Sequence, residues 1–400
     1  MEDRNRVRLS YPFFAAFSGS TVLLQHVRIN LPNESERKMN KVKRFAALFM
    51  TAALALSFSA CGSSDSGASD AASSAATSSA ASESAASDSS AAASSAAESS
   101  SGEAKTLNIA YQSSIAYAPL LVAMEKQMIE NAYDGDLTVN YQLMANGSEI
   151  NEAITAGSID VGCLGAAPAI TGMANGVPYK IFSGLSSQPY ALLSNDPAIN
   201  TLEDIGEGTQ IAITNINSHP HILLAMAAKE YLGDAHALDS NLVVLGNADG
   251  YSSILTGAVD CHMVISPYNF MEVESEDADI HELEIGKDVW PNGNTFIVGV
   301  AGTKLYEEDP DLYQALCDGI DEAMKFIEEN PEETAEIIAE GYDATPEEIL
   351  TWMQDERSAY QTELSGVLEL ASFMGEEAFL DADKVPTALE DIAFDNVKGN

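Results

Sequence analysis

Basic side chains are scarce in most of this 400-residue chain. Beyond Arg44 there are only nine lysines and Arg357, against 51 aspartates and glutamates from Lys105 onward. Such an acidic surface repels phosphate backbones and anionic lipid headgroups, which excludes nucleic acid as a partner. Most of these carboxylates are expected to form a solvated surface. A pocket for a small anion is still compatible with the charge, because backbone N–H dipoles can take the place of lysines.

Cysteine is equally rare, with four in the chain. Cys163 and Cys261 lie in apolar runs typical of buried strands, and Cys317 lies in an expected helix. None has the spacing of metal ligands and no pair is apparent. Free thiols that act as small hydrophobic groups are therefore favoured over a disulfide, and the disulfide state of the three is left open.

Motifs of catalysis and metal binding are lacking as well. The sequence holds no nucleophile elbow, no phosphate loop, no metal triad and no acid–base pair at workable spacing. His219 and His221 stand two residues apart at an expected helix start, without a third ligand within reach. We therefore predict a protein that is not an enzyme and that has neither a cofactor nor a metal site.

Large apolar side chains are absent from Gly62 to Ala104, which consist mostly of serine and alanine with scattered acids. Such a composition cannot build a core and predicts a flexible tether. The part able to fold is about 105–400, which is long enough for two domains.

An export signal begins at Met39. Lysines and an arginine precede the apolar run Phe45–Phe58, which is too short to span a bilayer core comfortably. Small residues then lead to Cys61, and this resembles the lipobox of bacterial lipoproteins, apart from Phe58 where leucine is usual. We expect translation to begin at Met39. The segments are then an upstream extension that is not translated (1–38), a signal peptide (39–60), and the lipidated Cys61 with its tether (61–104).

The stretch 147–174 carries the clearest structural pattern. Apolar residues at helical spacing predict a helix over 149–156, followed by a buried strand over 161–164. A helix is then expected to begin at Pro168, which suits a first helical position. A turn beyond the carboxyl end of a strand is a ready site for a ligand. Here that turn consists of Gly165, Ala166 and Ala167.

The same phrase occurs again one hundred residues later. Ile154–Asp160 (ITAGSID) returns as Ile254–Asp260 (ILTGAVD), and an apolar strand follows each copy. A single copy would mean little, because many helix-to-strand connections use glycine and aspartate. Two copies with matching followers favour two α/β lobes that present equivalent loops to one cleft.

Polar turns after the other expected strands supply further candidate ligand-binding residues. The turn after the strand at 107–111 offers hydrogen-bond donors and an amphipathic ring, and the turn after the strand at 210–214 leads into a helix. Serine at such a helix start can act as an N-cap instead, and a tyrosine can simply pack. The candidates are Gln112, Ser113, Ser114, Tyr117, Asn217, Ser218 and His219.

The second copy of the repeat adds three candidates. Asp249 lies in an expected loop, 246–251, where it can pair with a ligand ammonium or cap the next helix. Tyr251 belongs to the same loop, and Ser266 ends the strand that follows the repeat.

The C-terminal part is expected to be helical from Asp309 onward and to support the first lobe. Thr345 and Glu348 match a capping box at the start of one of its helices. An apolar stripe at helical spacing predicts a core-facing helix in this region. The stripe consists of Leu312, Leu316, Ile320, Ala323 and Ile327.

Four segments together resemble a known family. From Lys105 to the C-terminus, the chain is similar to solute-binding proteins of ABC importers, in the nitrate, sulfonate and taurine group of the type II periplasmic-binding fold. The similar segments, in order, are Ala110–Ser114, Gly147–Ala169, Leu202–His219 and Asn330–Glu333.

The resemblance implies a two-lobed α/β fold. Each lobe is expected to be a mainly parallel sheet flanked by helices, with a helical C-terminal tail. Closure by hinge motion is expected through crossover segments near 190–194 and 295–299. The expected parts are the first lobe (105–192), the second lobe (193–293), and the return to the first lobe with the C-terminal helices (294–400).

The resemblance also implies a function. A monomeric lipoprotein on the outer face of the cell membrane would capture a small molecule and deliver it to a permease and ATPase. By position, the family's ligand-binding turns correspond to Gln112, Ser113, Gly165–Ala167 and Ser218–His219. Sulfonate binders often have serines where this chain has Ala166 and Ala167, which removes two hydroxyl donors.

Taurine or another alkanesulfonate is the expected ligand, followed by nitrate-like anions and pyrimidine vitamin precursors. Two alternatives are left open. One is an exported or misassigned enzyme of the same fold that acts on a pyrimidine-type substrate, and the other is a ligand-sensing lipoprotein.

Overall fold

The computed structural model describes residues 104–283, 285 and 289–400. The expected signal peptide, the lipidation site Cys61, the tether and the upstream extension lie outside the described residues. Within the described part, no helix combines the length and the apolar character needed to cross a membrane.

The first sheet has five strands in the order β2-β1-β3-β10-β4. β1 is parallel to β2 and β3, whereas β10 is antiparallel to β3 and β4. The sheet is therefore mainly parallel, as predicted. Its strands are β1 (Lys105–Tyr111), β2 (Leu137–Leu143), β3 (Val161–Gly165), β4 (Tyr179–Ser186) and β10 (Ile297–Gly302).

The second sheet repeats this plan in the order β7-β6-β8-β5-β9. β6 is parallel to β7 and β8, and β5 is antiparallel to β8 and β9. The antiparallel strand of each sheet lies where the chain crosses from one lobe to the other. β5 directly follows β4 of the first sheet, and β10 directly follows β9 of the second. The strands are β5 (Tyr190–Ser194), β6 (Ile211–Ile213), β7 (Leu242–Val244), β8 (Cys261–Ile265) and β9 (His281–Glu282).

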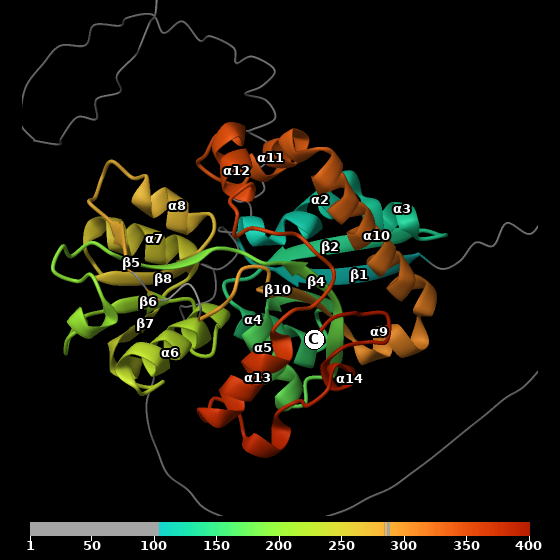
Figure 1. The fold of residues 1–400 in the computed structure, drawn as a ribbon. Helices are drawn as coiled ribbons and strands as arrows, with labels where there is room; N and C mark the ends of the chain where they lie inside the picture. The colour runs from blue at the N-terminus through green and yellow to red at the C-terminus, as the bar shows by residue number, and fades with distance from the viewer. Residues whose placement is uncertain (1–103, 284, 286–288) are drawn as a thin grey trace, which may run out of the picture. The chain divides into compact units, whose positions relative to one another are not determined.

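Helices cover both faces of the first sheet (Figure 1). On one face α10 packs against α2 and α3, and on the other α4 packs against α5 and β3, with α13 against α5. These helices are η1 (Ile115–Tyr117), α2 (Ala118–Lys126), α3 (Met128–Ala132), α4 (Gly147–Thr155), α5 (Ala166–Ala174), α9 (Thr303–Glu308) and α10 (Pro310–Glu329). The last part of the chain adds α11 (Pro331–Ala339), α12 (Pro346–Met353), α13 (Val367–Glu376), η4 (Ala382–Lys384) and α14 (Leu389–Ile392).

The second sheet is also flanked on both sides, with α7 and α8 on one face and α6 on the other (Figure 1). α6 and α7 end at Gly233 and Gly257, which take the left-handed conformation that favours glycine. The helices here are η2 (Leu202–Asp204), α6 (His219–Leu232), η3 (Asp239–Asn241), α7 (Asn247–Thr256) and α8 (Tyr268–Val273).

The repeated sequence phrase has the same structure in both lobes. Gly157 and Gly257 each have a φ of 71°, and the N–H of the next residue bonds back to the carbonyl of Ala153 or Ser253. The aspartate that closes each phrase also has one role. Asp160 accepts a hydrogen bond from the backbone N–H of Asn108 at 2.9 Å, and Asp260 accepts one from that of Gln210 at 2.8 Å. The repeat therefore fixes how a helix returns to its sheet.

Three differences between predicted boundaries and the structure bear on the lobes or the site. α5 begins at Ala166, two residues before Pro168, because Gly165 already has the extended backbone of an N-cap residue. The expected loop 246–251 is instead the start of α7. The strand 190–194 pairs with β8 and β9, so a lobe boundary between residues 192 and 193 falls inside the second sheet.

The C-terminal part confirms the apolar stripe and the capping box. All five stripe residues are buried in α10, and Thr345 and Glu348 exchange both hydrogen bonds of the box. The expectation of helix throughout is wrong for most of 377–400 and for 354–366, which is irregular and forms an isolated bridge between Ala359 and Ser187. This segment crosses near the site instead of continuing the helical layer.

Candidate functional site

A narrow cavity lies where strand ends of the two sheets meet. The centre of a water molecule can occupy only about 20 Å³ of this cavity, so the cavity has room for about one water molecule. Both sheets contribute to its wall, together with the start of β10. Its lining consists of Gln112, Tyr117, Gly147, Gly165, Pro168, Thr214, Asn215, Ser218, His219, Pro220, Asn247, Ile265, Phe296 and Ile297.

Four helices begin at this cavity. Gly147 of α4, Pro168 of α5, Asn247 of α7 and His219 of α6 all lie in first helical turns and all line it. The first N–H groups of a helix have no partner within the helix and carry the positive end of its dipole. No Lys, Arg, Asp or Glu is among the lining residues. The electrostatic character of the cavity therefore comes from backbone dipoles and neutral polar groups.

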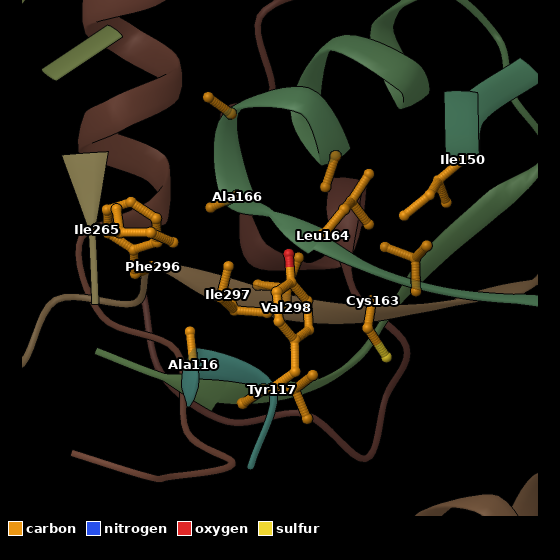
Figure 2. Close-up of a cluster of buried hydrophobic side chains, with 14 of the residues drawn as sticks. Ala116, Tyr117, Ile150, Cys163, Leu164, Ala166, Ile265, Phe296, Ile297 and Val298 are labelled. Atoms are coloured by element: carbon orange, nitrogen blue, oxygen red, sulfur yellow. The ribbon is translucent and has the colours of Figure 1, made fainter. Parts of the chain in front are cut away.

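The first lobe contributes the turn after β1. Gln112 donates a hydrogen bond from Nε2 to the hydroxyl of Tyr117 at 2.8 Å. Tyr117 is almost fully buried, and burial raises the pKa of its phenol well above the usual value. Figure 2 shows this ring within a hydrophobic cluster that includes Leu164 of β3 and Val298 of β10. Tyr117 is thus a fixed, neutral wall whose hydroxyl is held by Gln112.

His219 comes from the second lobe and is the most enclosed polar residue of the lining. Its side chain is 1% exposed and stacks on Phe296, with 4.2 Å between ring centroids, while Trp290 meets it edge-on. Neither ring nitrogen has a hydrogen-bond partner among the described residues. Burial lowers the pKa of His219 to about 3, so the imidazole is neutral. A neutral imidazole has one N–H donor and one acceptor nitrogen.

Two asparagines add further buried polar atoms. Asn215 donates from Nδ2 to the carbonyl of Ile216 at 2.9 Å and to the hydroxyl of Ser148 at 2.7 Å, so its Oδ1 is free to face elsewhere. Asn247 donates from Nδ2 to the carbonyl of Ser113 at 3.5 Å. Within the described part of the chain, Oδ1 of both asparagines is buried without a partner. Buried polar atoms are rarely left so, and both asparagines are among the residues that line the cavity.

A cluster of hydroxyl groups beside the cavity joins the two lobes. The hydroxyl of Ser113 lies 3.3 Å from that of Tyr268 and 3.5 Å from that of Tyr342. Ser114 caps η1 and donates from its hydroxyl to the carbonyl of Ser266 at 2.5 Å. These contacts hold the described state closed, which agrees with the small volume of the cavity.

The structure brings together five of the thirteen ligand-binding candidates on the cavity wall: Gln112, Tyr117, Gly165, Ser218 and His219. Ser218 also accepts a hydrogen bond from the N–H of His221, so it is the N-cap of α6. Ser113, Ser114 and Ser266 belong to the adjacent interlobe contacts. Tyr251 lies behind them in the second lobe, 6.0 Å from Tyr268 between ring centroids. Asn217 lies next to the wall and has a left-handed backbone with a φ of 61°.

The remaining three candidates are neither on the wall nor among these neighbouring contacts. Ala166 and Ala167 are fully buried, and the N–H of Ala166 donates to the carbonyl of Phe296 at 2.9 Å. The expectation that this N–H holds an anion is therefore wrong for the described state. Asp249 is exposed in the first turn of α7 and does not line the cavity.

Sequence reasoning missed nine lining residues. Asn215 and Asn247 are polar and follow strand ends, so the rule that selected Ser218 could have found them. The others are small or apolar, and Phe296 and Ile297 enter from the returning strand β10. Figure 2 shows Phe296 and Ile265 at one end of the cluster, away from Ile150 and Cys163. Nothing in an apolar strand marks the side chain that faces a cleft.

The cysteines and acids form no second site in the described residues. Cys163, Cys261 and Cys317 are free thiols, and burial raises the pKa of Cys163 to about 12. Across residues 104–283, 285 and 289–400, no group of three His, Cys, Asp or Glu side chains could hold a metal ion.

Two mainly parallel sheets of equal topology, with one cavity at their strand ends, define the two-lobed fold of periplasmic binding proteins. The chain belongs to the NMT1-like family, whose sequence model matches residues 100–340. This family assignment and the fold agree with the resemblance found in the sequence.

Individual proteins resemble this chain in sequence or in fold. A Bacillus subtilis (strain 168) protein, whose name assigns it the binding of aliphatic sulfonates, is 26% identical over 242 residues, which are 59% of this chain and 69% of that protein. The alkanesulfonate-binding protein SsuA from Xanthomonas axonopodis pv. citri, solved bound to MOPS, superposes with a TM-score of 0.59. It is 19% identical, and the match covers 75% of this chain and 100% of that one.

A second solved structure is the periplasmic aliphatic sulphonate-binding protein SsuA from Escherichia coli. It superposes with a TM-score of 0.55 at 20% identity, and the match covers 74% of this chain and 94% of that one. At these identities the structures establish a shared fold.

Proposed function

We propose that this protein binds a small solute between its two lobes and delivers it to an ABC importer. One observation carries the proposal: buried polar atoms of Asn215, Asn247 and His219 at the cavity wall lack partners among the described residues. Buried polar atoms without a partner favour a bound ligand or an ordered water that supplies the missing hydrogen bonds. This cavity has room for about one water molecule. The names of the relatives point in the same direction.

The proposed solute is an alkanesulfonate or a similar small anion, with taurine as the first choice. Four helix starts line the cavity, and the positive ends of their dipoles favour an anion without any lysine or arginine, although the first N–H of α5 is bonded to Phe296. Binding requires the lobes to open, because the described cavity is too small for a sulfonate. The contacts of Ser113 with Tyr268 and of Ser114 with Ser266 would break on opening and form again on closure.

The protein is further proposed to be a lipoprotein, anchored through Cys61 on the outer face of the membrane. The acidic surface suits this role, since a permease can present complementary basic patches. A Cys61→Ser variant expressed in cells is expected to leave the membrane fraction and appear in the soluble extracytoplasmic fraction. Continued membrane association of the variant would contradict the anchor.

Isothermal titration of the purified domain with taurine, propane-1-sulfonate, MOPS and nitrate tests the binding function. At least one sulfonate is expected to bind with a dissociation constant in the micromolar range or below. Gln112→Ala should weaken that binding at least tenfold, because it removes the group that holds the Tyr117 hydroxyl. Gln142→Ala, on the exposed part of edge strand β2, is the matched control and should bind as the wild type does. The absence of any sulfonate binding would overturn the proposal.

A further inference from the structure

The two lobes also meet outside the cavity, where α12 of the first lobe lies next to α8 of the second (Figure 1). α12 packs on α11, which packs on α2, whereas α8 packs on β5, β8 and α7. The indole of Trp352 in α12 stacks on the ring of Phe270 in α8, with 5.8 Å between ring centroids. Trp352 also donates from Nε1 to a carboxylate oxygen of Glu274 at 3.4 Å. One side chain of the first lobe thus makes an apolar and a polar contact with the second.

Arg357, the only arginine beyond Arg44, joins the same contact. Its guanidinium carbon lies 5.8 Å from the centre of the Phe270 ring, within the range of a cation–π contact. Its Nη1 lies 4.0 Å from a carboxylate oxygen of Glu282 in β9 of the second lobe. Its Nε and Nη2 donate to the two carboxylate oxygens of Asp355, at 2.8 and 3.1 Å. The guanidinium therefore lies between carboxylates of the two lobes and packs on the ring that α12 also covers.

The segment that carries Arg357 is fixed to a crossover between the lobes. Ala359 and Ser187 exchange backbone hydrogen bonds at 2.8 and 2.9 Å, and Ser187 lies between β4 and β5. The hydroxyl of Ser358 donates to the carbonyl of Trp352 at 3.2 Å. A side chain presented by a braced segment loses less conformational freedom when it makes a contact.

This contact continues the hydroxyl cluster beside the cavity. Tyr342, which precedes α12, meets Tyr268 of α8 edge-on, with 6.3 Å between ring centroids. Among the described residues, however, the partners of the α12–α8 contact and the cavity lining have no member in common. A contact that forms only when the lobes are closed stabilises the closed state whatever the ligand is.

We propose that Trp352, Arg357, Phe270, Glu274 and Glu282 form an interlobe latch. The latch stabilises the closed conformation from outside the cavity and slows the release of a bound solute. The effect on release rests on the proposed function, whereas the effect on lobe closure does not.

The distance between two spin labels, one on each lobe, measures closure without any ligand. Glu336→Cys in α11 and Ser252→Cys in α7 provide the two positions, which are exposed and lie outside the latch. The labels are placed in the full chain with Cys61→Ser and Cys317→Ser, so that only the two buried cysteines of β3 and β8 remain besides them. Longer distances report open molecules.

Phe270 is the residue to change first, because it is half-buried and both side chains of the first lobe contact its ring. Phe270→Ala should lower the ratio of closed to open molecules about tenfold. Arg357→Lys keeps the charge but loses the planar group, and should lower the ratio about threefold. Phe270→Tyr keeps the ring and should behave as the wild type does. Tyr231→Ala, which removes an exposed aromatic ring from α6 of the same lobe, is the control.

Identical distance distributions in the wild type, Phe270→Ala and Arg357→Lys would overturn the latch. A loss of closure in Phe270→Tyr as large as that in Phe270→Ala would also contradict it, because the ring would then have no role. Thermal unfolding of each variant shows that it is folded.

Release is measured with radiolabelled taurine, propane-1-sulfonate and MOPS, by dilution and rapid filtration. Phe270→Ala should raise the dissociation rate of every sulfonate that binds by the same factor, about tenfold, because the latch does not touch the ligand. An unchanged dissociation rate would overturn the effect on release. If none of the three compounds binds, the proposed function fails, and the spin-label distances still decide whether the latch exists.

Discussion

The two lobes share one backbone plan, yet they fill the same helix–strand contact in opposite ways. In the first lobe Ile150 of α4 covers Gly162 of β3, where an added Cβ would lie 2.6 Å from the isoleucine side chain. One hundred residues later, Gly250 of α7 faces His262 of β8, and an added Cβ at the glycine would lie 2.5 Å from the imidazole. The large side chain is on the helix in the first lobe and on the strand in the second, and a glycine faces it in each case.

The exchange has a chemical consequence. His262 is fully buried and its Nδ1 lies 2.6 Å from a carboxylate oxygen of Glu272, which is buried as well. Burial raises the pKa of Glu272, against the lowering effect of the histidine. The first lobe has only apolar groups at the corresponding contact. A repeat in sequence thus preserves the backbone connection, while packing and polarity diverge.

The largest expected effect comes from removing the buried pair of His262 and Glu272, which distinguishes the second lobe from the first. His262→Ala should lower the free energy of unfolding by about 3–5 kcal/mol, because it leaves the carboxyl of Glu272 buried without its partner. The double variant His262→Leu/Glu272→Met should recover most of that loss, since it replaces the pair by apolar groups of similar size. Denaturant unfolding of the three proteins measures both values. A loss below about 1 kcal/mol in the single variant would show that the pair is dispensable.

A second prediction concerns His219, the imidazole that the second lobe contributes to the cavity wall. The pKa of His219 is about 3 in the folded state against a usual value of 6.5. Below pH 6.5 the unfolded chain therefore binds a proton that the folded chain does not, and stability falls with pH until about pH 3. This amounts to ~2 kcal/mol at pH 5.

His219→Phe keeps a ring against Phe296 and removes the titration. The stability of the variant, measured by denaturant unfolding between pH 7 and pH 5, should therefore fall less than that of the wild type. Parallel pH profiles for the two proteins would contradict the assignment of a neutral, buried imidazole.

The smallest predicted effect concerns the glycine that the two lobes share in the repeated phrase. Gly157→Ala and Gly257→Ala should each cost about 1 kcal/mol, because both glycines have a left-handed φ of 71° and open space around them. Gly206→Ala, with open space and no such φ, is the control and should change stability by less than about 0.5 kcal/mol. Unequal costs at the two repeat glycines, measured by denaturant unfolding, would mean that the shared phrase does not have the same structural role.

Much of the fold could be predicted from these same patterns. The repeat, the apolar strands and the capping box depend on local chemistry, so they were correctly located to within a few residues. The start of α5 was placed too late, since alanine is a strong helix former and Ala166 needs no proline to begin the helix.

The site was less predictable, for two physical reasons. Gln112 and His219 could be found because polar turns after parallel strands gather at one edge of a sheet. Phe296 and Ile265 could not, because apolar side chains near the ends of strands look the same in sequence whether they face a core or a cleft. The Ala166 N–H was assigned to a ligand, but a carbonyl from the distant strand end at Phe296 occupies it.

The chain has two tryptophans, of which Trp352 stacks across the two lobes and Trp290 lies beside the cavity within the second lobe. The ring of Trp290 meets His219 edge-on, and Trp352 of α12 stacks on Phe270 of α8 with an interplanar angle of 3°. Opening would separate Trp352 from Phe270 and expose this indole to solvent, while Trp290 stays beside His219. Intrinsic fluorescence is consequently a label-free reporter of lobe motion in the unmodified protein, and Trp352 is the indole that reports it.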